Sequence, residues 1–561
     1  MTKFLTGRSL RFMITFFALV ILQGACFAQN GGGGTASAQP ASTASQPTPV
    51  PADVLKELEA MKARIAELEA QLKSMKSQDV ASAPVSVNAV PAPPDVSATA
   101  AAGQPVTNAT NASTAPEGTT LAASAPAADA KPAKSEPFAF ADWTWLNGNP
   151  RTKDTPWATK FFTPEFRADV NYVLDFHHPQ DDTIGGSSEV FRSNEVQVTD
   201  LGVGGDFHFD NVRGRVLSQI GLYSVTTPRN DASPARGQWD LADAYRYVSE
   251  AYGGYHFNAL HGVNVDAGIF LSYIGLFSFY QFDNWAYQPS YVSSNTPWFF
   301  NGVRTQVFVT DKLKIEPWFI NGWQSYGRFN SRPGFGVQVA WRPNGKVSIV
   351  ANQYFLGEEA LGNVQRKRLH TDDSIEVKYY DNPMRFMDKA AFSFTADLGC
   401  EYGGGVSCLG NRAGGPKQSF VGAMFYTRFW FLNDRYGLTL GGGAINNPGR
   451  YLVLLPPING ATAASGTPYF TENPGDPYKA WDSSVTLDYM PSQYITFRSE
   501  FNYRASNVPY FTGSGGITPT NCPTAPTVLN ICGTPGAFVP GFTPDLRKNE
   551  ARMTFAILVK F

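Results

Sequence analysis

The side chains best suited to acid–base or metal chemistry are six histidines scattered along the chain. Only His208 and His256 fall on strand positions that alternate toward the interior of the barrel inferred below; the others are His177, His178, His261 and His370. No Gly-x-Ser-x-Gly turn, His-Glu-x-x-His pair or phosphate-binding loop accompanies them. We therefore expect no enzyme, no cofactor and no metal ion. The pairs His177-His178 and Asp372-Asp373 are interpreted as solvated outer loops, with metal binding as the alternative.

The cysteines fall into two close pairs, Cys400/Cys408 and Cys522/Cys532, besides Cys26 near the N-terminus. Each pair closes a short loop within a Gly- and Pro-rich stretch, and no histidine stands near either pair. A zinc site needs four convergent thiolate or imidazole ligands. Two local disulfides are therefore expected, since an exported chain can oxidise them.

Charged residues alternate with apolar ones along the body of the chain. If these segments are strands of a barrel, the charged residues all point to the inner face and should line a lumen. Both signs occur in this set, with some basic excess. Solvated ion pairs on the lumen wall are the main interpretation, and ion-selecting charge rings are the alternative. The set comprises Asp169, Asp206, Arg213, Arg215, Arg246, Glu250, Arg304, Glu316, Glu376, Lys378, Arg428, Arg498, Glu500 and Arg504.

The last strand, 550–561, shows the alternation best. Phe561, Val559, Ile557, Phe555 and Met553 lie on one face, with mostly polar residues between them. In a soluble sandwich the apolar face would meet a second sheet, whereas in an outer-membrane barrel it meets lipid. The closing Phe561 is similar to the membrane-insertion signal of Gram-negative outer-membrane proteins.

Composition agrees with a barrel in a membrane. Lys3, Arg8 and Arg11 precede an apolar run, and small residues follow, so 1–28 is predicted to be a signal peptide. The chain is 14% aromatic and only 16% charged, with 52 glycines. A soluble globule usually carries about 25% charged residues. The balance of 45 basic and 47 acidic residues argues against a nucleic-acid partner.

Between the signal peptide and the barrel, the chain changes character four times. Residues 29–50 are predicted to be disordered, and 79–136 to form an Ala/Pro-rich linker. Between them, 51–78 carries a heptad seam from Val54 to Met75, which predicts a coiled-coil helix in the periplasm, with a lone amphipathic helix as the alternative. Aromatic residues return in 137–163, a periplasmic plug-like or barrel-leading segment. The barrel itself is expected over 164–561.

Turn signals divide the barrel into strands. Seven short turns, such as Asp210-Asn211 and Pro491-Ser492-Gln493, alternate with eight long connections: 177–195, 226–245, 272–298, 324–332, 357–371, 399–417, 446–479 and 505–549. The pattern predicts an all-β fold, a transmembrane antiparallel barrel of about sixteen strands. Short turns face the periplasm in such barrels, so both barrel ends should lie there. A sixteen-stranded barrel is wide enough to leave an aqueous channel.

A family resemblance rests on dispersed positions. The stretch 263–302, with Asn284-Trp-Ala-Tyr287 and Ser290-Tyr291, then Asn321-Gly-Trp323 and 494–504 carry it, together with Phe561. In these residues the chain resembles the OmpL-like family of Gram-negative β-barrel porins. The resemblance implies a pore-forming outer-membrane barrel, and a homotrimer by analogy with porins, joined through the barrel wall and the coiled coil. Outer-membrane lipid and lipopolysaccharide would surround it.

The third long connection, 272–298, is the loop that narrows the pore in general porins. Here it is aromatic and carries one charge, and its constriction candidates are Tyr280, Asp283, Trp285, Tyr287 and Tyr291. An aromatic strip could guide neutral solutes such as sugars; alternatively, the loop packs against the rim or a neighbouring protomer. The sequence thus predicts passive diffusion of small hydrophilic solutes. A non-conducting structural or adhesive barrel, tethered by its coiled coil, is the alternative.

Overall fold

The computed structural model describes residues 62, 67, 136–180, 182, 184, 189–228, 231, 233, 238–328, 332–358, 367–403, 407–410, 417–448, 478–515 and 545–561. The chain divides into two units, 1–99 and 100–561. In the first unit Lys62 and Glu67 are helical. The rest of the expected coiled coil, the signal peptide, 29–50 and the linker up to residue 135 lie outside the described residues. No described helix is long and apolar enough to cross a bilayer.

Sixteen strands of the second unit form one closed antiparallel barrel, as the turn pattern predicts. Neighbours in sequence are neighbours in the wall, and β18 follows β15 and returns to β1. The wall strands are β1 (Phe162–Asp175), β2 (Val196–Phe209), β3 (Val212–Ser218), β4 (Val248–Phe257), β5 (Val263–Leu271), β6 (Phe299–Thr310), β7 (Leu313–Ile320), β8 (Gly334–Asn344), β9 (Val347–Glu358), β10 (Lys367–Asp381), β11 (Met387–Tyr402), β12 (Ser419–Phe431), β13 (Tyr436–Asn447), β14 (Tyr478–Ser492), β15 (Ile495–Ser506) and β18 (Asn549–Lys560).

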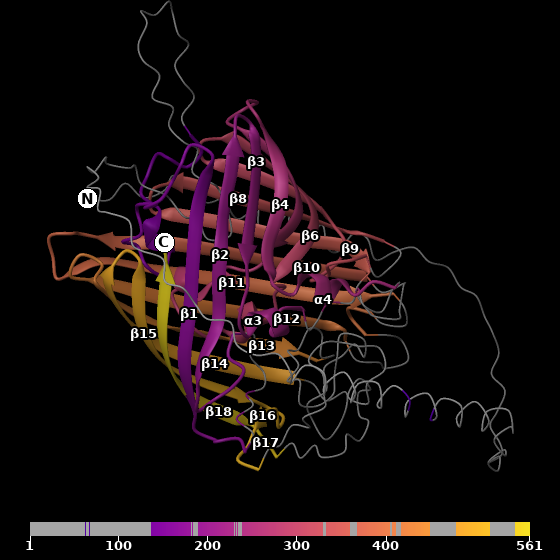
Figure 1. The fold of residues 1–561 in the computed structure, drawn as a ribbon. Helices are drawn as coiled ribbons and strands as arrows, with labels where there is room; N and C mark the ends of the chain where they lie inside the picture. The colour runs from indigo at the N-terminus through magenta and orange to yellow at the C-terminus, as the bar shows by residue number, and fades with distance from the viewer. Residues whose placement is uncertain are drawn as a thin grey trace, which may run out of the picture. The chain divides into compact units, whose positions relative to one another are not determined.

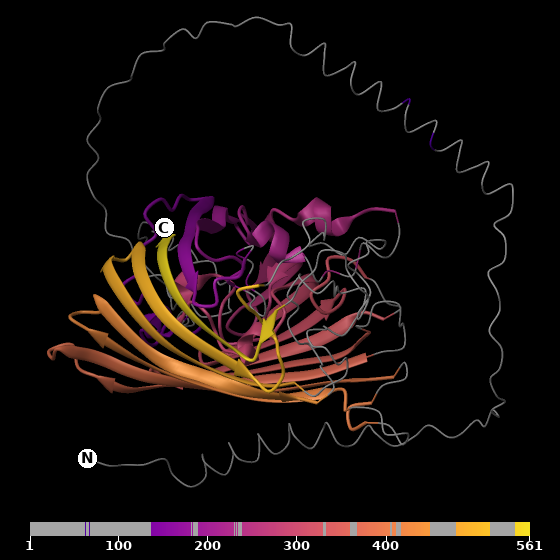
Figure 2. The same cartoon turned by 90° about the horizontal axis from the view of Figure 1, so that it is seen from below.

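The first and last strands close the wall. Tyr172 on β1 pairs with Phe555 on β18, and Val170 with Ile557. Figures 1 and 2 show the two strands side by side, with the C-terminus at the same end of the barrel as the start of β1. Closure leaves no unpaired strand edge, which a membrane-spanning sheet requires because lipid offers no hydrogen-bond partner.

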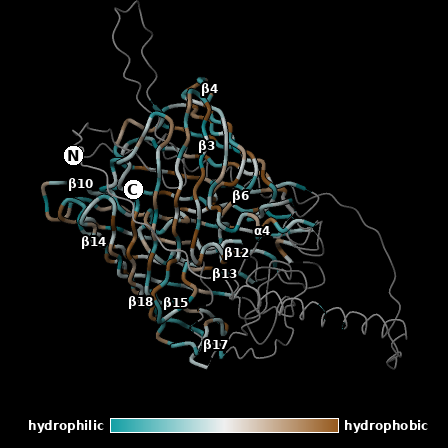
Figure 3. The backbone as a smooth tube through the Cα atoms, in the orientation of Figure 1, coloured by the Kyte–Doolittle hydropathy of each residue, from teal (hydrophilic) through white to brown (hydrophobic). Residues whose placement is uncertain are grey.

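The strands turn their apolar side chains outward. On β18, Phe555 and Ile557 are 48% and 46% exposed, whereas Arg552 and Thr554 are 1% and 2% exposed. Figure 3 shows this alternation of hydrophobic and hydrophilic positions along the wall. A water-soluble barrel would have the reverse arrangement, so the outer surface is suited to lipid.

Non-strand segments fill much of the interior. Two stretches contribute most: 136–161 before β1, and the connection between β5 and β6. They pack against inward-facing Tyr426 and Trp430 of β12 in the largest apolar cluster. The short elements outside the wall are η1 (Thr144–Leu146), α3 (Tyr223–Thr226), α4 (Leu241–Tyr245), η4 (Gln281–Asp283), α5 (Tyr291–Ser294) and the two-stranded sheet β16 (Phe511–Thr512) with β17 (Leu546–Arg547).

One predicted connection is wrong in extent. Strand β10 begins at Lys367, so His370 lies in the wall and not in the outer loop expected over 357–371. Asp372 and Asp373, interpreted from the sequence as solvated outer-loop residues, also lie in this strand. His370 and Asp372 are buried, at 3% and 0% exposure. Charged residues at the start of β10 resemble loop composition, and this similarity concealed the strand.

Candidate functional site

The connection 272–298, here called the third loop, crosses the barrel interior. It leaves the wall after β5 and returns at β6. In a ring of sixteen strands, β13 and β14 stand opposite this point. The loop reaches them: on its far side, the Ser290 hydroxyl donates to Asp482 Oδ2 of β14 at 2.8 Å, and the Tyr291 amide donates to the same oxygen at 3.0 Å. The third loop therefore spans the lumen and is fixed to the opposite wall.

Asp283 is the point at which the loop binds the closing strands. Arg167 of β1 donates to Asp283 Oδ2 at 2.8 Å, and Lys560 of β18 donates to Oδ1 at 3.2 Å. Burial raises the pKa of Asp283, but the charges of Arg167 and Lys560 outweigh burial and lower it below its ordinary value. The carboxylate is therefore ionised at neutral pH and holds both cations.

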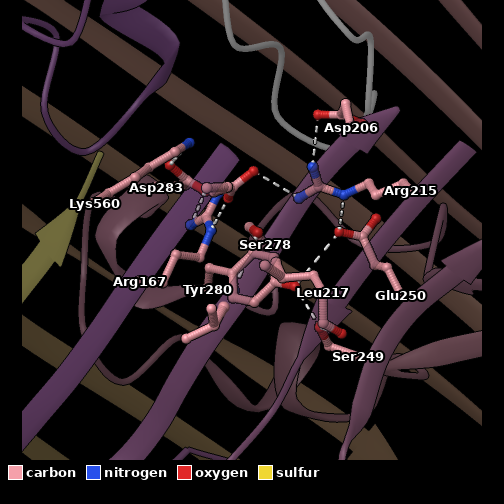
Figure 4. Close-up of polar contacts among 12 residues, drawn as sticks. Arg167, Asp206, Arg215, Leu217, Ser249, Glu250, Ser278, Tyr280, Asp283 and Lys560 are labelled. Atoms are coloured by element: carbon pink, nitrogen blue, oxygen red, sulfur yellow. Dashed lines mark hydrogen bonds and ion pairs between the residues drawn. The ribbon is translucent and has the colours of Figure 1, made fainter. Parts of the chain in front are cut away.

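Arg215 of β3 extends this network along the wall (Figure 4). It pairs with Glu250 at 2.6 Å, and with Asp206 and Glu165 at 2.8 Å each. Glu165 also pairs with Arg167, which links the network to the third loop.

Tyr280 connects the same wall to the loop. Its hydroxyl lies 2.8 Å from Ser249 Oγ, and the Arg167 guanidinium lies 3.9 Å from its ring centroid. The loop is therefore held on this side by a cation–π contact as well as by ion pairs.

Replacing Arg215 with Met should destabilise the barrel strongly. The substitution leaves three buried carboxylates without their shared cation, and breaking a buried ion pair costs about 3–5 kcal/mol. Urea titration of the refolded protein in lipid vesicles, read by tryptophan fluorescence, measures this loss. An unchanged unfolding midpoint would contradict the structural role of Arg215.

Arg498 and Glu500 of β15 hold the loop backbone. Arg498 donates to the carbonyls of Gln281 at 3.0 Å and Asn284 at 2.6 Å, while pairing with Asp488. Glu500 accepts the amides of Tyr287 at 2.6 Å and Gln288 at 2.7 Å. Main-chain groups of a loop inside a barrel need such partners, because an unpaired buried group is costly.

The other predicted lining residues divide into two groups. Arg504 stacks 4.3 Å from the Tyr291 ring centroid and donates to the Pro289 carbonyl at 3.1 Å. Arg304 and Arg213 both approach Asp266, at 3.0 Å and 3.3 Å. Arg246 does not lie on a wall strand: it follows helix α4 in an outer connection and pairs with Asp243 at 3.1 Å.

The aromatic candidates are packed and do not form an exposed strip. Tyr280, Trp285, Tyr287 and Tyr291 are all at most 5% exposed. Trp285 makes an edge contact with Trp430 of β12, with centroids 5.6 Å apart. The Tyr287 hydroxyl donates to Asp169 at 2.9 Å. These rings fix the loop to the wall.

A small cavity remains between the third loop and the outer connections. Its volume is about 30 Å³, and Tyr223, Phe279 and Trp298 contribute to its lining. A single water needs about 10–15 Å³, so this space suits one or two waters and no sugar.

The interior charge differs from the sequence expectation. In the described part of the chain, buried strand positions carry sixteen carboxylates and twelve basic side chains, so the excess is acidic and not basic. Two carboxylate pairs stand directly opposite each other on neighbouring strands: Asp169 with Asp200, and Asp372 with Asp397. No group of three or more His, Cys, Asp or Glu among the described residues could hold a metal ion.

Several residues of the site were missed or only partly recognised. Arg167 and Lys560 are not among the predicted lining or constriction residues, although each stands between two apolar neighbours on its strand. Asp482 and Asp488 have the inward parity of β14, which is the signal that could have identified them. Nothing in the sequence shows that the third loop reaches that strand.

One expected disulfide is present. Cys400, near the end of β11, is bonded to Cys408 in the following connection. Cys522 and Cys532 lie outside the described residues.

The segment before β1 lies across the other end of the lumen. The Phe138 amide donates to the Asp311 carbonyl in the β6–β7 turn at 2.7 Å, and Asn149 Nδ2 donates to the Ser492 carbonyl at the β14–β15 turn at 3.1 Å. Between these contacts, Trp143 and Trp145 are 0% and 1% exposed. The interior is therefore occupied from two directions, by this segment and by the third loop.

Comparison with solved structures finds low similarity spread over most of the barrel. The outer membrane channel DcaP of Acinetobacter baumannii is 12% identical, with a TM-score of 0.38, over 72% of this chain and 99% of that one. OprB of Pseudomonas putida is 10% identical, with a TM-score of 0.40, over 71% and 94%. An anion-selective porin from Comamonas acidovorans is 11% identical, with a TM-score of 0.40, over 71% and 99%.

No curated protein matches the chain. A family model does: the family described as "Putative beta-barrel porin-2, OmpL-like" matches residues 167–529. That range runs from β1 past β15 and includes the third loop with its anchoring strands β12, β14 and β15. The closed barrel, its apolar outer face and this match together make the chain a member of the OmpL-like family of outer-membrane β-barrel porins.

Proposed function

We propose that this barrel passes small hydrophilic solutes passively across the outer membrane, through a lumen narrowed by the third loop. The observation that carries the proposal is the fixing of that loop across a sixteen-stranded barrel by Asp283, Arg498 and Glu500. Wall side chains alone do not fill a barrel of this width. A loop held across the lumen by polar contacts would limit the size of the solutes that pass. We propose no catalytic role.

We further propose that the lumen favours cations. The excess of buried carboxylates over basic side chains supports this, because an acidic wall lowers the energy of a permeating cation and raises that of an anion. The Arg215 and Asp283 networks are internally paired and contribute little net charge. The selectivity should therefore come from the inward-facing carboxylates outside these two networks, and the opposed pairs on β1–β2 and β10–β11 are the first to test.

Single-channel recording of the refolded mature protein in a planar bilayer tests the function. Stepwise openings in multiples of three would support a trimeric porin. A barrel that inserts in folded form but stays silent in every variant tested would exclude passive transport. A structural or adhesive barrel held by its periplasmic coiled coil would then be favoured.

The oligomer proposed here is a homotrimer in lipid and lipopolysaccharide, supported by the heptad seam of 54–75. Replacing Ile65 with Lys puts a charge into that seam and should shift the detergent-extracted protein from trimer to monomer, measured by light scattering. Replacing Lys62, on the helix flank, with Gln is the matched control and should leave the trimer intact. A trimer that persists in the Ile65 variant would show that the barrel wall alone assembles it.

A further inference from the structure

Residues 136–152, here called the strap, run across the mouth of the barrel at its short-turn end. Their contacts with the β6–β7 and β14–β15 turns lie on opposite sides of the ring. The Thr152 hydroxyl donates to the Gln493 carbonyl at 2.8 Å, and a Cβ at Gly345, in the β8–β9 turn, would lie 2.8 Å from the Ala141 Cβ. The strap thus spans the full width of the mouth.

The strap presents aromatic rings to basic groups of the wall. The Arg342 guanidinium of β8 lies 4.7 Å from the Phe138 ring and 4.6 Å from the Trp143 ring. The Lys378 ammonium of β10 lies 5.8 Å from the Trp145 ring. The faces of these rings attract the basic groups of the wall. The large aromatic side chains of the strap can therefore pack inside a polar lumen.

One glycine joins the strap to the third loop. The Gly148 amide donates to the Asp283 carbonyl at 2.9 Å, and Arg428 of β12 donates to the Gly148 carbonyl at 2.7 Å and to the Trp285 carbonyl at 3.2 Å. A Cβ at Gly148 would lie 2.4 Å from the Asn284 carbonyl oxygen and 2.5 Å from that of Phe282. Only glycine fits between the two segments.

The barrel does not need the strap to close. Over 136–161 the described residues form only the short helix η1 and no wall strand. The pairing of β1 with β18, here called the barrel seam, closes the wall without the strap. Departure of the strap would therefore break side-chain contacts and main-chain hydrogen bonds such as those of Phe138 and Gly148, but no part of the strand ladder.

From these observations we infer that the strap is a removable plug, which closes the periplasmic mouth when docked and opens the lumen when it leaves. The inference rests on the proposed porin function. In the closed state, the contacts of Gly148, Trp143 and Trp145 hold the strap in the mouth. The third loop then sets the size limit of the open state, and the strap decides whether the channel is open.

The test is single-channel recording of full-length mature protein carrying Gly148→Val. The added side chain meets two carbonyl oxygens and should raise the ratio of open to closed time by about tenfold or more, the usual effect of an overpacked contact. Gly253→Ala is the matched control, since a Cβ there meets no atom within 4 Å. An open fraction in Gly148→Val equal to that of the wild type would overturn the plug.

A crosslink gives the converse result and does not depend on the folding of the Gly148 variant. Cysteines replacing Ala141 and Gly345 should form a disulfide that holds the strap in place, so the channel stays closed until a reductant is added. Wild-type protein with the same reductant controls for Cys400–Cys408. Unimpeded conductance of the crosslinked protein would refute the plug while leaving the porin proposal standing. Silence of all folded variants, reduced or not, would instead refute the porin proposal.

Discussion

Asp283→Asn should widen the channel and weaken the barrel at the same time. The substitution removes the only charge of the third loop and leaves Arg167 and Lys560 buried without their shared carboxylate. Loss of one partner from a buried ion pair costs about 3–5 kcal/mol. We expect a larger single-channel conductance, a higher size limit in liposome swelling with sugars, and a lower unfolding midpoint in urea.

The matched control is Asp243→Asn, the same chemical change at an exposed pair with Arg246 outside the wall. Such a pair is worth about 0.3–0.5 kcal/mol. Equal conductance and swelling rates in the Asp283 variant and the wild type would show that the third loop does not set the aperture.

Acid should act in the same direction as Asp283→Asn. Because the folded-state pKa of Asp283 is lowered, its stabilising contribution is complete above the unfolded pKa of about 3.9. The contribution is lost as the pH falls through the lower folded value. A rise in conductance confined to strongly acidic solution, and absent from the Asn variant, would identify this carboxylate as its cause.

Neutralising one opposed carboxylate pair should reduce cation selectivity without reducing stability. Asp372 and Asp397 face each other on β10 and β11, and both are fully buried. Like charges directly opposite one another destabilise a sheet, but the substitution also removes the contact of Asp397 with His370 at 2.7 Å, so the unfolding midpoint of the double Asn variant should stay close to that of the wild type.

The measurement is the reversal potential across a tenfold KCl gradient, which is bounded by about 59 mV for a perfectly selective channel. The reversal potential of the wild type should have the sign of a cation-selective channel, and that of the double variant should be closer to zero. A wild type on the anion side would contradict the proposed selectivity. An unchanged potential in the double variant would place the selecting charges elsewhere, with Asp169 and Asp200 as the next pair to test.

Alternation and turn chemistry were sufficient to predict the wall. The period of two, broken by pairs such as Asp210-Asn211, predicted sixteen strands and the inward parity of Arg215, Arg498 and Glu500. Parity failed where the backbone is irregular. The register shifts between Asp169 and Val170 in the β1–β2 pairing, and Asp200, which pairs at that point, was not among the predicted lining residues. Arg246 was assigned by extending β4 two residues before its start at Val248.

The interior segments were much less predictable. The path of the third loop depends on groups from strands distant in sequence, such as Asp482 and Arg498, and no local pattern encodes that meeting. The aromatic residues of 137–163 indicated a plug-like or barrel-leading segment. The requirement for glycine at 148, however, follows from the carbonyls of a loop more than a hundred residues away in the chain.

The contacts of Asp283 also bear on how the chain folds. Its two cation partners stand on β1 and β18, the strands whose pairing joins the two ends of the barrel sequence. Bringing such distant segments together costs more loop-closure entropy than forming a hairpin between neighbouring strands. A residue of the third loop, distant in sequence from β18, therefore acts as a template for the last step of closure. The third loop can assist this step only if it already lies inside the barrel when β1 meets β18, whereas the strap, attached only at β1, can enter afterwards.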